Sequence, residues 1–375
     1  MKKIGITGHN GFIGYHLYTY IKYFEKEYEP IKLSTNLQSS KLAEDFGDDC
    51  DIIIHLGEKN KNNKGLSDEV IYDNNRNSTK TLIDNLEKRG KKNMKLFYAS
   101  STHEDDDSLY GQYRRENKKD FQDWADKTES TFNWFRIPNV FGPFCRPNYN
   151  SFIATFCHKI MNNEEVDLIE KGTEIPIIYV DNLCDQIMSF VEETPSQKGL
   201  TIMPDVNVTV TDIYDRLKMY KSVYIDQQII PQLANVHDLN LFNTFRSYIS
   251  DDDIVMTTKM FKDERGMLGE TIKTLHQGQS FFSTTNPGQV RGNHFHVRKL
   301  ERFCVLKGKG KINLRKVNTD KIITYELDGN KTQFIDMPLY YVHNITPSDE
   351  NEIVVLFWTN ELLNESDTDT YHELV

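Results

Sequence analysis

The sequence predicts two domains: an α/β domain with a doubly wound parallel sheet, followed by an all-β barrel. Three observations predict this order. Apolar runs alternate with amphipathic helical stretches over roughly the first 140 residues, which is typical of β-α-β units. A glycine-spaced loop joins the first run to the first helical stretch. Beyond residue 257, short β-rich runs alternate with Gly, Asn, Asp and Pro turns, which favours a small barrel or sandwich.

The first domain is expected to contain five strands and at least two helices. Helical periodicity covers 11–28, and a second, polar helical stretch follows the third strand to about residue 90. The expected strands are residues 3–8, 30–34, 50–56, 95–101 and 132–138. Residues 145–250 are mixed and mostly helical, which indicates a subdomain that covers the substrate. The acidic run at 250–254 suggests a junction, so we predict domains over 1–252 and 253–375.

Composition restricts the class of protein. Hydrophobic residues make up 38% and charged residues 27%, and the net charge of −11 argues against binding to nucleic acid or to an anionic membrane. The five cysteines are scattered without a CxxC pair, which favours a reducing compartment. No apolar run reaches the roughly 18 residues that span a bilayer. We therefore expect a cytoplasmic protein.

The loop after the first strand predicts a dinucleotide site. Gly8, Gly11 and Gly14 form a G-x-x-G-x-x-G pattern between a strand and a helix. Glycines let the backbone turn tightly and approach a pyrophosphate at the helix N-terminus, where free N–H groups favour an anion.

The loop with its flanking residues resembles the extended short-chain dehydrogenase/reductase family, whose loop reads TGxxGFIG. Three later stretches are also similar to family motifs: Asp51–Gly57, Arg136–Pro143 and Ile178–Asn182. The resemblance implies a Rossmann fold and a nicotinamide cofactor. The cofactor-binding residues that it implies are Gly8, Gly11, Phe12, Ile13, Gly14, His55, Leu56, Gly57, Tyr110, Arg114 and Asn139.

The expected catalytic group departs from the family pattern. The family uses Y-x-x-x-K, in which lysine binds ribose and lowers the pKa of the tyrosine, whereas this chain has Tyr110 followed by Arg114. Tyr113 fits less well, because its partner would be Asn117. Ser101, with Thr102 beside it, fits the hydroxyl partner. Arginine keeps the charge but is bulkier than lysine.

The nicotinamide cofactor is expected to be NADPH. An NAD site requires a carboxylate at the end of the second strand, whereas this chain has Ser34 and Thr35 there.

The C-terminal half carries a candidate metal site. Gly288, His294, His296, Glu301 and Gly308 match the spacing of the first cupin motif, and Pro338 with His343 matches part of the second. Side chains two residues apart on a strand point to the same face. The ligands His294, His296, Glu301 and His343 suit a divalent metal such as Zn.

An alternative for this half is a barrel without metal, in which a histidine acts as base. Arg265-Gly266 and Arg291-Gly292-x-His294 resemble signatures of metal-free dTDP-sugar 3,5-epimerases. The base is left open among His294, His296, Lys299 and the Tyr340/Tyr341 pair.

The order of the two halves, with the stretch 144–160, resembles the CapF-type family of bifunctional capsular-polysaccharide enzymes over essentially the whole chain. The resemblance implies C3 epimerisation of a UDP-linked 4-keto-6-deoxy-N-acetylhexosamine, followed by NADPH-dependent reduction at C4. It implies UDP-2-acetamido-2,6-dideoxy-talose as product, and it suggests a homodimer. The substrate residues that it suggests are Arg146, Asn148, Tyr149 and Asn150.

Two other hypotheses stay open at this point. One is a cupin epimerase whose reductase domain is impaired by Arg114, and the other is a non-enzymatic sensor of a nucleotide sugar or cofactor.

Overall fold

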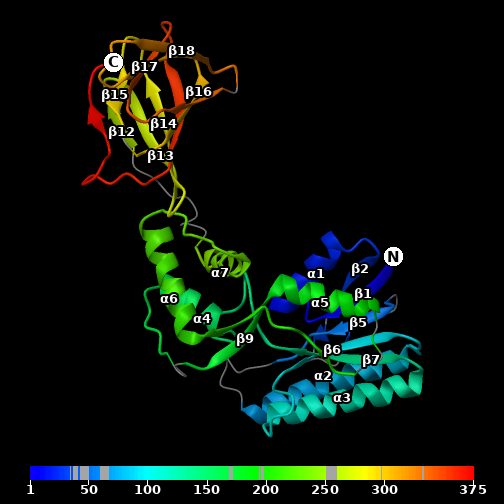
Figure 1. Cartoon of the computed structure of the whole chain (residues 1–375). Coiled ribbons are helices and arrows are strands. Elements are labelled where there is room, and N and C mark those ends of the chain that lie inside the picture. The colour runs from blue at the N-terminus through cyan, green and yellow to red at the C-terminus, as the bar shows by residue number, and fades with distance from the viewer. Residues whose placement is uncertain are drawn as a thin grey trace. The chain divides into compact units, whose positions relative to one another are not determined.

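The computed structural model describes residues 1–33, 35–36, 41–42, 50–59, 67–168, 172–193, 195, 198–250, 260–296, 298–331 and 333–375 (Figure 1). The chain divides into two compact units. The first comprises Met1–Lys218 and Asn235–Ile249, and the second comprises Met219–Ala234 and Ser250–Val375. The predicted boundary between residues 252 and 253 lies outside the described residues.

A parallel six-stranded sheet forms the centre of the first unit. Its order, β10-β7-β6-β5-β1-β2, places β1 in the interior of the sheet, next to β5. The strands are β1 (Lys2–Thr7), β2 (Tyr28–Leu33), β5 (Ile52–His55), β6 (Lys95–Ser101), β7 (Thr131–Ile137) and β10 (Leu200–Thr201). The doubly wound sheet predicted from the alternating runs is confirmed.

Helices cover both faces of this sheet (Figure 1). On one face α1 (Phe12–Phe24) and α5 (Val180–Glu193) pack with Ile52 and Ile54 of β5. On the other face α2 (Asp68–Lys88) and α3 (Leu109–Thr128) pack with Ile53. Successive β5 residues thus enter opposite cores, as the period of two along a strand requires. The run is apolar throughout because both faces are buried.

The rest of the first unit is smaller and mixed. A three-stranded sheet has the order β11-β9-β8. The remaining elements here are β3 (Thr35–Asn36), β4 (Lys41–Leu42), β8 (Asn139–Phe141), α4 (Phe152–Met161), β9 (Glu174–Tyr179), β11 (Val206–Thr209), α6 (Val210–Tyr220) and α7 (Val236–Arg246). A π-helical turn, η1 (Lys221–Asp226), follows α6 and belongs to the second unit.

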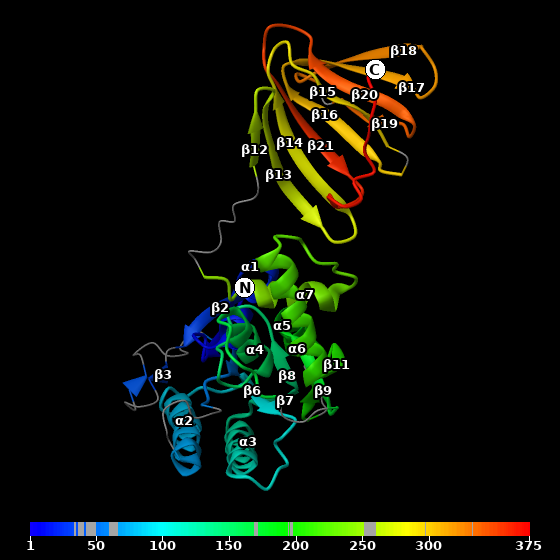
Figure 2. The same cartoon turned by 90° about the vertical axis from the view of Figure 1, so that its left-hand side faces the viewer.

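The second unit is built from two antiparallel sheets (Figure 2). The six-stranded sheet has the order β12-β13-β14-β21-β16-β19, and the five-stranded sheet has the order β18-β17-β20-β15-β22. The strands of the first are β12 (Met260–Asp263), β13 (Gly266–Thr274), β14 (Gly278–Thr285), β16 (Glu301–Lys307), β19 (Phe334–Met337) and β21 (Ile353–Thr359). Those of the second are β15 (Arg291–Phe295), β17 (Lys309–Lys316), β18 (Ile322–Asp328), β20 (Tyr341–Pro347) and β22 (Tyr371–His372).

Both sheets contribute to one apolar core in this unit. Val305 and Val355 come from the six-stranded sheet, and Ile312 and Ile345 come from the five-stranded sheet. The all-β prediction is confirmed in this form, and closure into a cupin barrel stays a prediction. The segment before α7 also belongs here, since Ile230 N–H donates to the Lys273 carbonyl of β13 at 2.8 Å.

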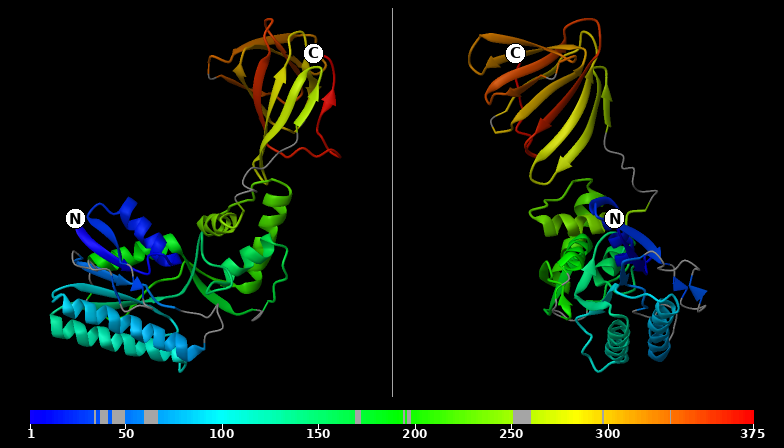
Figure 3. Two further views of the ribbon diagram at one scale, coloured as in Figure 1. Left: turned by 180° about the vertical axis from the view of Figure 1, so that it is seen from behind. Right: turned by 90° about the vertical axis from the view of Figure 1, so that its right-hand side faces the viewer.

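The end of the chain returns to the edge of the five-stranded sheet (Figure 3). There β22 pairs antiparallel with β15, which brings His372 opposite His294. In the described part of the chain, no helix has the length and apolarity to cross a bilayer. The cysteines form no disulfides among themselves.

Candidate functional sites

A cleft of about 810 Å³ opens in the first unit where β1, β5 and β6 end. The carboxyl edge of a parallel sheet is the usual place for a nucleotide site. Most residues predicted to bind the cofactor or substrate line this cleft. They are Gly8, Gly11, Phe12, Ile13, Gly14, Leu56, Ser101, Tyr110, Arg114, Asn139, Arg146, Tyr149 and Asn150.

The glycine loop requires its glycines for steric reasons. Gly8 has a φ of +71°, and a Cβ on it would lie 2.8 Å from the carbonyl carbon of Leu56. A Cβ on Gly14 would lie 2.2 Å from the Gly8 oxygen. Helix α1 therefore starts directly against the loop, which leaves its first N–H groups facing the cleft, where an anion is favoured.

Two predicted cofactor residues, His55 and Gly57, do not line the cleft and instead contact Thr7, which directly precedes the glycine loop. The Thr7 hydroxyl accepts from Leu56 N and Gly57 N, both at 3.1 Å, and lies 2.7 Å from His55 Nδ1. Because the two N–H groups occupy the lone pairs of the hydroxyl, its single proton is donated to Nδ1 of a neutral His55 ring. Burial lowers the pKa of His55 to about 3, which agrees with a neutral ring.

Four other predicted residues are placed elsewhere or are not fully described. Thr102 does not line the cleft, and its N–H donates to the Ile137 carbonyl at 3.4 Å. Asn148 is also outside the lining, and its N–H donates to Thr155 Oγ1 at 3.0 Å. Ser34 lies outside the described residues, and only the backbone of Thr35 is described.

Helix α3 presents Tyr110 to the cleft. Ser108 caps the helix by accepting from Gly111 N at 3.2 Å, so Tyr110 lies in the first turn. Tyr113 points into the core, where it is 1% exposed. The structure therefore places Tyr110, rather than Tyr113, beside Ser101 in the cleft wall.

Arg114 is buried and paired with a carboxylate that sequence reasoning missed. Its Nη2 lies 3.2 Å from Glu58 Oε2, and both side chains are 4% exposed. Its Nη1 donates to the Ala99 carbonyl, and its guanidinium lies 4.9 Å from the centroid of the Tyr110 ring. Glu58 follows the strand-end motif 51–57 directly, but no local pattern connects it to a residue 56 positions later.

The Glu58 carboxylate is also held by two other groups. Tyr98 Oη donates to Glu58 Oε1 at 2.7 Å, and Asn117 Nδ2 donates to the same oxygen at 2.9 Å. Burial raises the pKa of Glu58, while Arg114 and these two donors favour the carboxylate. Burial lowers the pKa of Arg114, but Glu58 together with Tyr98, Tyr110 and Tyr113 outweighs burial, so this pKa lies well above its usual range. We therefore treat the two groups as an ion pair.

A second buried carboxylate, Glu104, anchors the segment that follows Ser101. Ser100 Oγ donates to Glu104 Oε2 at 2.5 Å. Arg136 Nε and Lys118 Nζ lie 2.7 and 3.0 Å from its other oxygen. Burial raises the pKa of Glu104, but these donors outweigh it and lower the pKa overall. Glu104 thereby links the end of β6, where Ser101 lies, to α3 and β7.

The four predicted metal ligands converge in the second unit. His294, His296, Glu301 and His343 each offer a ligand atom, and these atoms lie within 4.8 Å of one another. His294 lies on β15 and His343 on β20, while Glu301 begins β16 of the other sheet. His296 Nε2 and His343 Nε2 lie 3.1 and 3.3 Å from the same oxygen, Glu301 Oε2.

This donor set fits a divalent metal ion. The facing atoms His296 Nε2, His343 Nε2 and Glu301 Oε2 are buried and make no hydrogen bond of ordinary geometry. Burial disfavours the Glu301 carboxylate, but the two imidazoles outweigh this effect and lower its pKa. Burial, with His343 next, lowers the pKa of His294 to about 3, so its ring is neutral and available as a ligand. Three imidazoles and a carboxylate suit Zn.

The structure also shows the surroundings of the other residues that were predicted as candidates for a base. Lys299 is buried, and its Nζ donates to the Thr368 carbonyl, which leaves it occupied. Tyr341 packs against the core, whereas Tyr340 is 53% exposed. His372, which sequence reasoning missed, is exposed and lies 6.0 Å from the His294 ring between centroids. Only the pairing of β22 with β15 reveals its position.

Known families match both halves of the chain. Residues 4–203 match the NAD dependent epimerase/dehydratase family, and residues 261–371 match the polysaccharide biosynthesis C-terminal domain. The chain is 28% identical over 370 residues to a UDP-2-acetamido-2,6-beta-L-arabino-hexul-4-ose reductase of Pseudomonas aeruginosa, covering 98% of each chain.

Solved structures match the whole chain as well. The crystal structure of the capsular polysaccharide assembling protein CapF from Staphylococcus aureus is 30% identical, with a TM-score of 0.80 over 99% of this chain and 100% of that one. A CapF structure with the inhibitor 3-isopropenyl-tropolone is also 30% identical, with a TM-score of 0.76 over the full length of both chains. The chain belongs to the NAD-dependent epimerase/dehydratase family and, over its full length, to the CapF type of capsular-polysaccharide protein.

Proposed function

We propose that this protein is a bifunctional nucleotide-sugar enzyme of capsular polysaccharide synthesis. Its C-terminal domain, a cupin, would epimerise C3 of a UDP-linked 4-keto-6-deoxy-N-acetylhexosamine. Its N-terminal domain would then reduce C4, which gives UDP-2-acetamido-2,6-dideoxy-talose. The observation that carries the proposal is the cleft that joins the glycine loop to Ser101, Tyr110 and Arg114. The full-length match to a reductase of a UDP-linked hexul-4-ose supports the substrate class.

In the cleft, the residues would bind the ketone and supply its proton. NADPH supplies the hydride to C4. Ser101 and Tyr110 would donate hydrogen bonds to the C4 oxygen, and Tyr110 would transfer its proton there, so that a secondary alcohol forms. Arg146, Tyr149 and Asn150 lie in the same wall and would contact the nucleotide sugar.

Positive charge next to the glycine loop favours NADPH over NADH. A neighbouring hollow of about 570 Å³ is lined by His9, Lys22 and Lys32, together with aromatic residues of α1. Lys32 is the penultimate residue of β2, the strand whose end faces the adenosine ribose in this type of fold. A 2′-phosphate would therefore meet cationic side chains.

In the C-terminal cluster, His294, His296, Glu301 and His343 would hold a divalent metal, which we propose to be Zn. A metal ion there supplies Lewis-acid stabilisation of the negative charge that develops when C3 loses its proton. His372 lies at the edge of the cluster and adds to the candidates for the base.

The chemistry explains why one chain would carry both sites. The C3 proton is acidic only while C4 is a ketone, because the enolate needs the carbonyl to hold its charge. Reduction at C4 then fixes the configuration at C3. Epimerisation must therefore come first, and reduction draws the reversible step forward.

Proton NMR in D₂O tests the proposal in one sample that contains the keto sugar, enzyme and NADPH. We expect deuterium at C3 and a new carbinol signal at C4. Exchange without the carbinol signal would favour the second candidate, an epimerase with an impaired reductase domain. The observation that favours this candidate is the buried pairing of Arg114 with Glu58, since Arg114 stands where the family has lysine. If neither signal appears, the remaining hypothesis is a sensor of nucleotide sugars or cofactors.

We also expect a homodimer and a cytoplasmic location, and a monomer mass in light scattering would contradict the first.

A further inference from the structure

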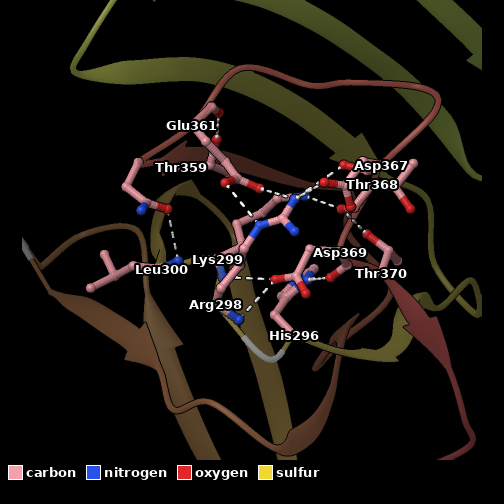
Figure 4. Close-up of polar contacts among 11 residues, drawn as sticks. His296, Arg298, Lys299, Leu300, Thr359, Glu361, Asp367, Thr368, Asp369 and Thr370 are labelled. Carbon is pink, nitrogen blue, oxygen red and sulfur yellow. Dashed lines mark hydrogen bonds and ion pairs between the residues drawn. The ribbon is translucent and has the colours of Figure 1, made fainter.

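The C-terminal segment that precedes β22 runs along the stretch that carries three of the candidate ligands (Figure 4). Asp369 lies at its centre. This side chain is 4% exposed, although aspartate rarely occurs in a core, and its φ of +46° is unusual for a residue other than glycine. A buried carboxylate on a strained backbone indicates that the surrounding contacts hold it there.

The backbone carbonyl of Asp369 lies 2.5 Å from His296 Nδ1. A carbonyl can only accept, so the proton of a neutral His296 ring must be on Nδ1. Its other nitrogen, Nε2, then carries the lone pair, and this atom is the one that faces Glu301 Oε2 at 3.1 Å. Asp369 therefore selects the tautomer that can bind a metal through Nε2.

The side chain of Asp369 binds the backbone of Arg298 and Lys299, which lie between the candidate ligands His296 and Glu301 in the sequence. Its Oδ2 accepts from the backbone N–H of Arg298 at 3.0 Å and from that of Lys299 at 2.7 Å. One residue thus fixes the ring of one ligand and the chain that leads to the next.

Neighbouring residues strengthen the same connection. Lys299 Nζ donates to the Thr368 carbonyl, and Arg298 Nη2 lies 2.8 Å from Asp367 Oδ2. Asp367 is 57% exposed, so solvent screens its ion pair with Arg298, and this pair contributes little. The buried contacts of Asp369 therefore contribute most of the connection between the C-terminal segment and the candidate ligands.

We propose that Asp369 is a positioning residue for the candidate metal site, which makes the C-terminal segment part of that site. The inference rests on the proposed metal site. Asp369 is not itself a ligand, because its carboxylate is engaged with the backbone N–H groups of Arg298 and Lys299.

The test is zinc affinity, measured by competition with a chromogenic chelator, for the full chain and four variants. Asp369→Asn keeps the size but cannot accept from both N–H groups with one charged oxygen. Asp369→Gly removes the side chain but suits the positive φ and keeps the carbonyl. We expect both to weaken zinc binding by about 10- to 100-fold, the usual cost of losing an outer-shell partner.

Asp367→Asn is the matched control, with the same chemical change two residues away on an exposed side chain. It should stay within about twofold of the wild type, as an exposed ion pair requires. The unfolding midpoint of each zinc-free protein is measured in parallel. A lower midpoint with unchanged zinc affinity would show that Asp369 is only structural and would overturn the inference.

His296→Ala separates this inference from the one on which it rests. If the wild type binds zinc no better than His296→Ala, the proposed metal site itself is wrong, and the inference falls with it. If His296→Ala loses zinc while Asp369→Asn and Asp369→Gly bind like the wild type, only the role of Asp369 is wrong.

Discussion

In the N-terminal cleft, the guanidinium of Arg114 faces the carboxylate of Glu58 at 3.2 Å, whereas in the C-terminal cluster one oxygen of Glu301 faces His296 and His343 at 3.1 and 3.3 Å. Both carboxylates are buried, but their partners differ. Arginine is always protonated, while imidazole is half-protonated only near its usual pKa of about 6.5.

This difference in partners indicates whether each site requires a bound cation to balance its buried charge. The Arg114–Glu58 pair is neutral as a unit, and Tyr98 and Asn117 both donate to Oε1 of its carboxylate. The Glu301 carboxylate, in contrast, is balanced only when a histidine takes up a proton or a cation binds among the ligands. We therefore expect the cleft to be complete without a metal and the cluster to respond to one.

The largest expected effect separates the two activities. Tyr110→Phe should lower the rate of C4 reduction by about 10²- to 10⁴-fold, because the ketone oxygen loses its proton donor. Deuterium exchange at C3 should persist, since it belongs to the other domain. His343→Ala should have the reverse pattern. Loss of both activities in either variant would show that the sites do not act separately.

Removal of Glu58 should strongly destabilise the first unit. Glu58→Ala leaves the Arg114 charge buried without its carboxylate, and we expect a loss of about 3–5 kcal/mol in the free energy of unfolding. The double variant Glu58→Leu/Arg114→Met should be closer to the wild type than Glu58→Ala is, because neither charge remains. Denaturant unfolding measures all three. Additive effects of the two positions would contradict the pairing.

Zinc should stabilise the second unit. If zinc binds only the folded state, a concentration 100 times the dissociation constant adds about 2.7 kcal/mol. Chelation should therefore lower the unfolding midpoint, and added zinc should restore it. His343→Ala is the control that should not respond. An unfolding midpoint that is the same with chelator and with zinc would contradict the expectation that the C-terminal cluster, unlike the cleft, responds to a metal.

Replacing Arg114 by lysine sharpens the comparison further. A lysine could still reach Glu58, but it would lose the planar set of donors that contacts Glu58 and Ala99 together. One lost hydrogen bond to a charged group corresponds to roughly tenfold, and we expect kcat for reduction to fall by about that factor. A higher kcat would instead show that arginine had weakened an ordinary reductase site.

The smallest effect concerns the choice of cofactor. Lys32→Ala should raise the KM for NADPH about fivefold, which corresponds to about 1 kcal/mol for one exposed charge, and leave the KM for NADH unchanged. Steady-state kinetics with both cofactors measures the ratio. Equal changes for the two cofactors would show that Lys32 does not face a 2′-phosphate.

The sequence by itself determined the features that depend on short spacings. Gly8, Gly11 and Gly14 mark the candidate nucleotide loop by their spacing, and a Cβ on Gly14 would clash with Gly8 within the loop itself. The candidate ligands His294 and His296 were also predictable from the sequence, since they are two residues apart, a spacing that points both side chains to one face on a strand. Periodicity of 2.0 and 3.6 residues likewise predicted the order of the two domains.

Only the tertiary structure decided which groups complete each site. Glu58 meets Arg114 because β5 ends and α3 begins at the same cleft, and Asp369 meets His296 across 73 residues because β22 pairs with β15. His55 supports the glycine loop instead of lining the cleft, since the adjacent strand places Thr7 beside it. The physical reason is that burial and ion pairing depend on which distant segments the packed sheets bring together, and a backbone carbonyl such as that of Asp369 has no signature in a sequence.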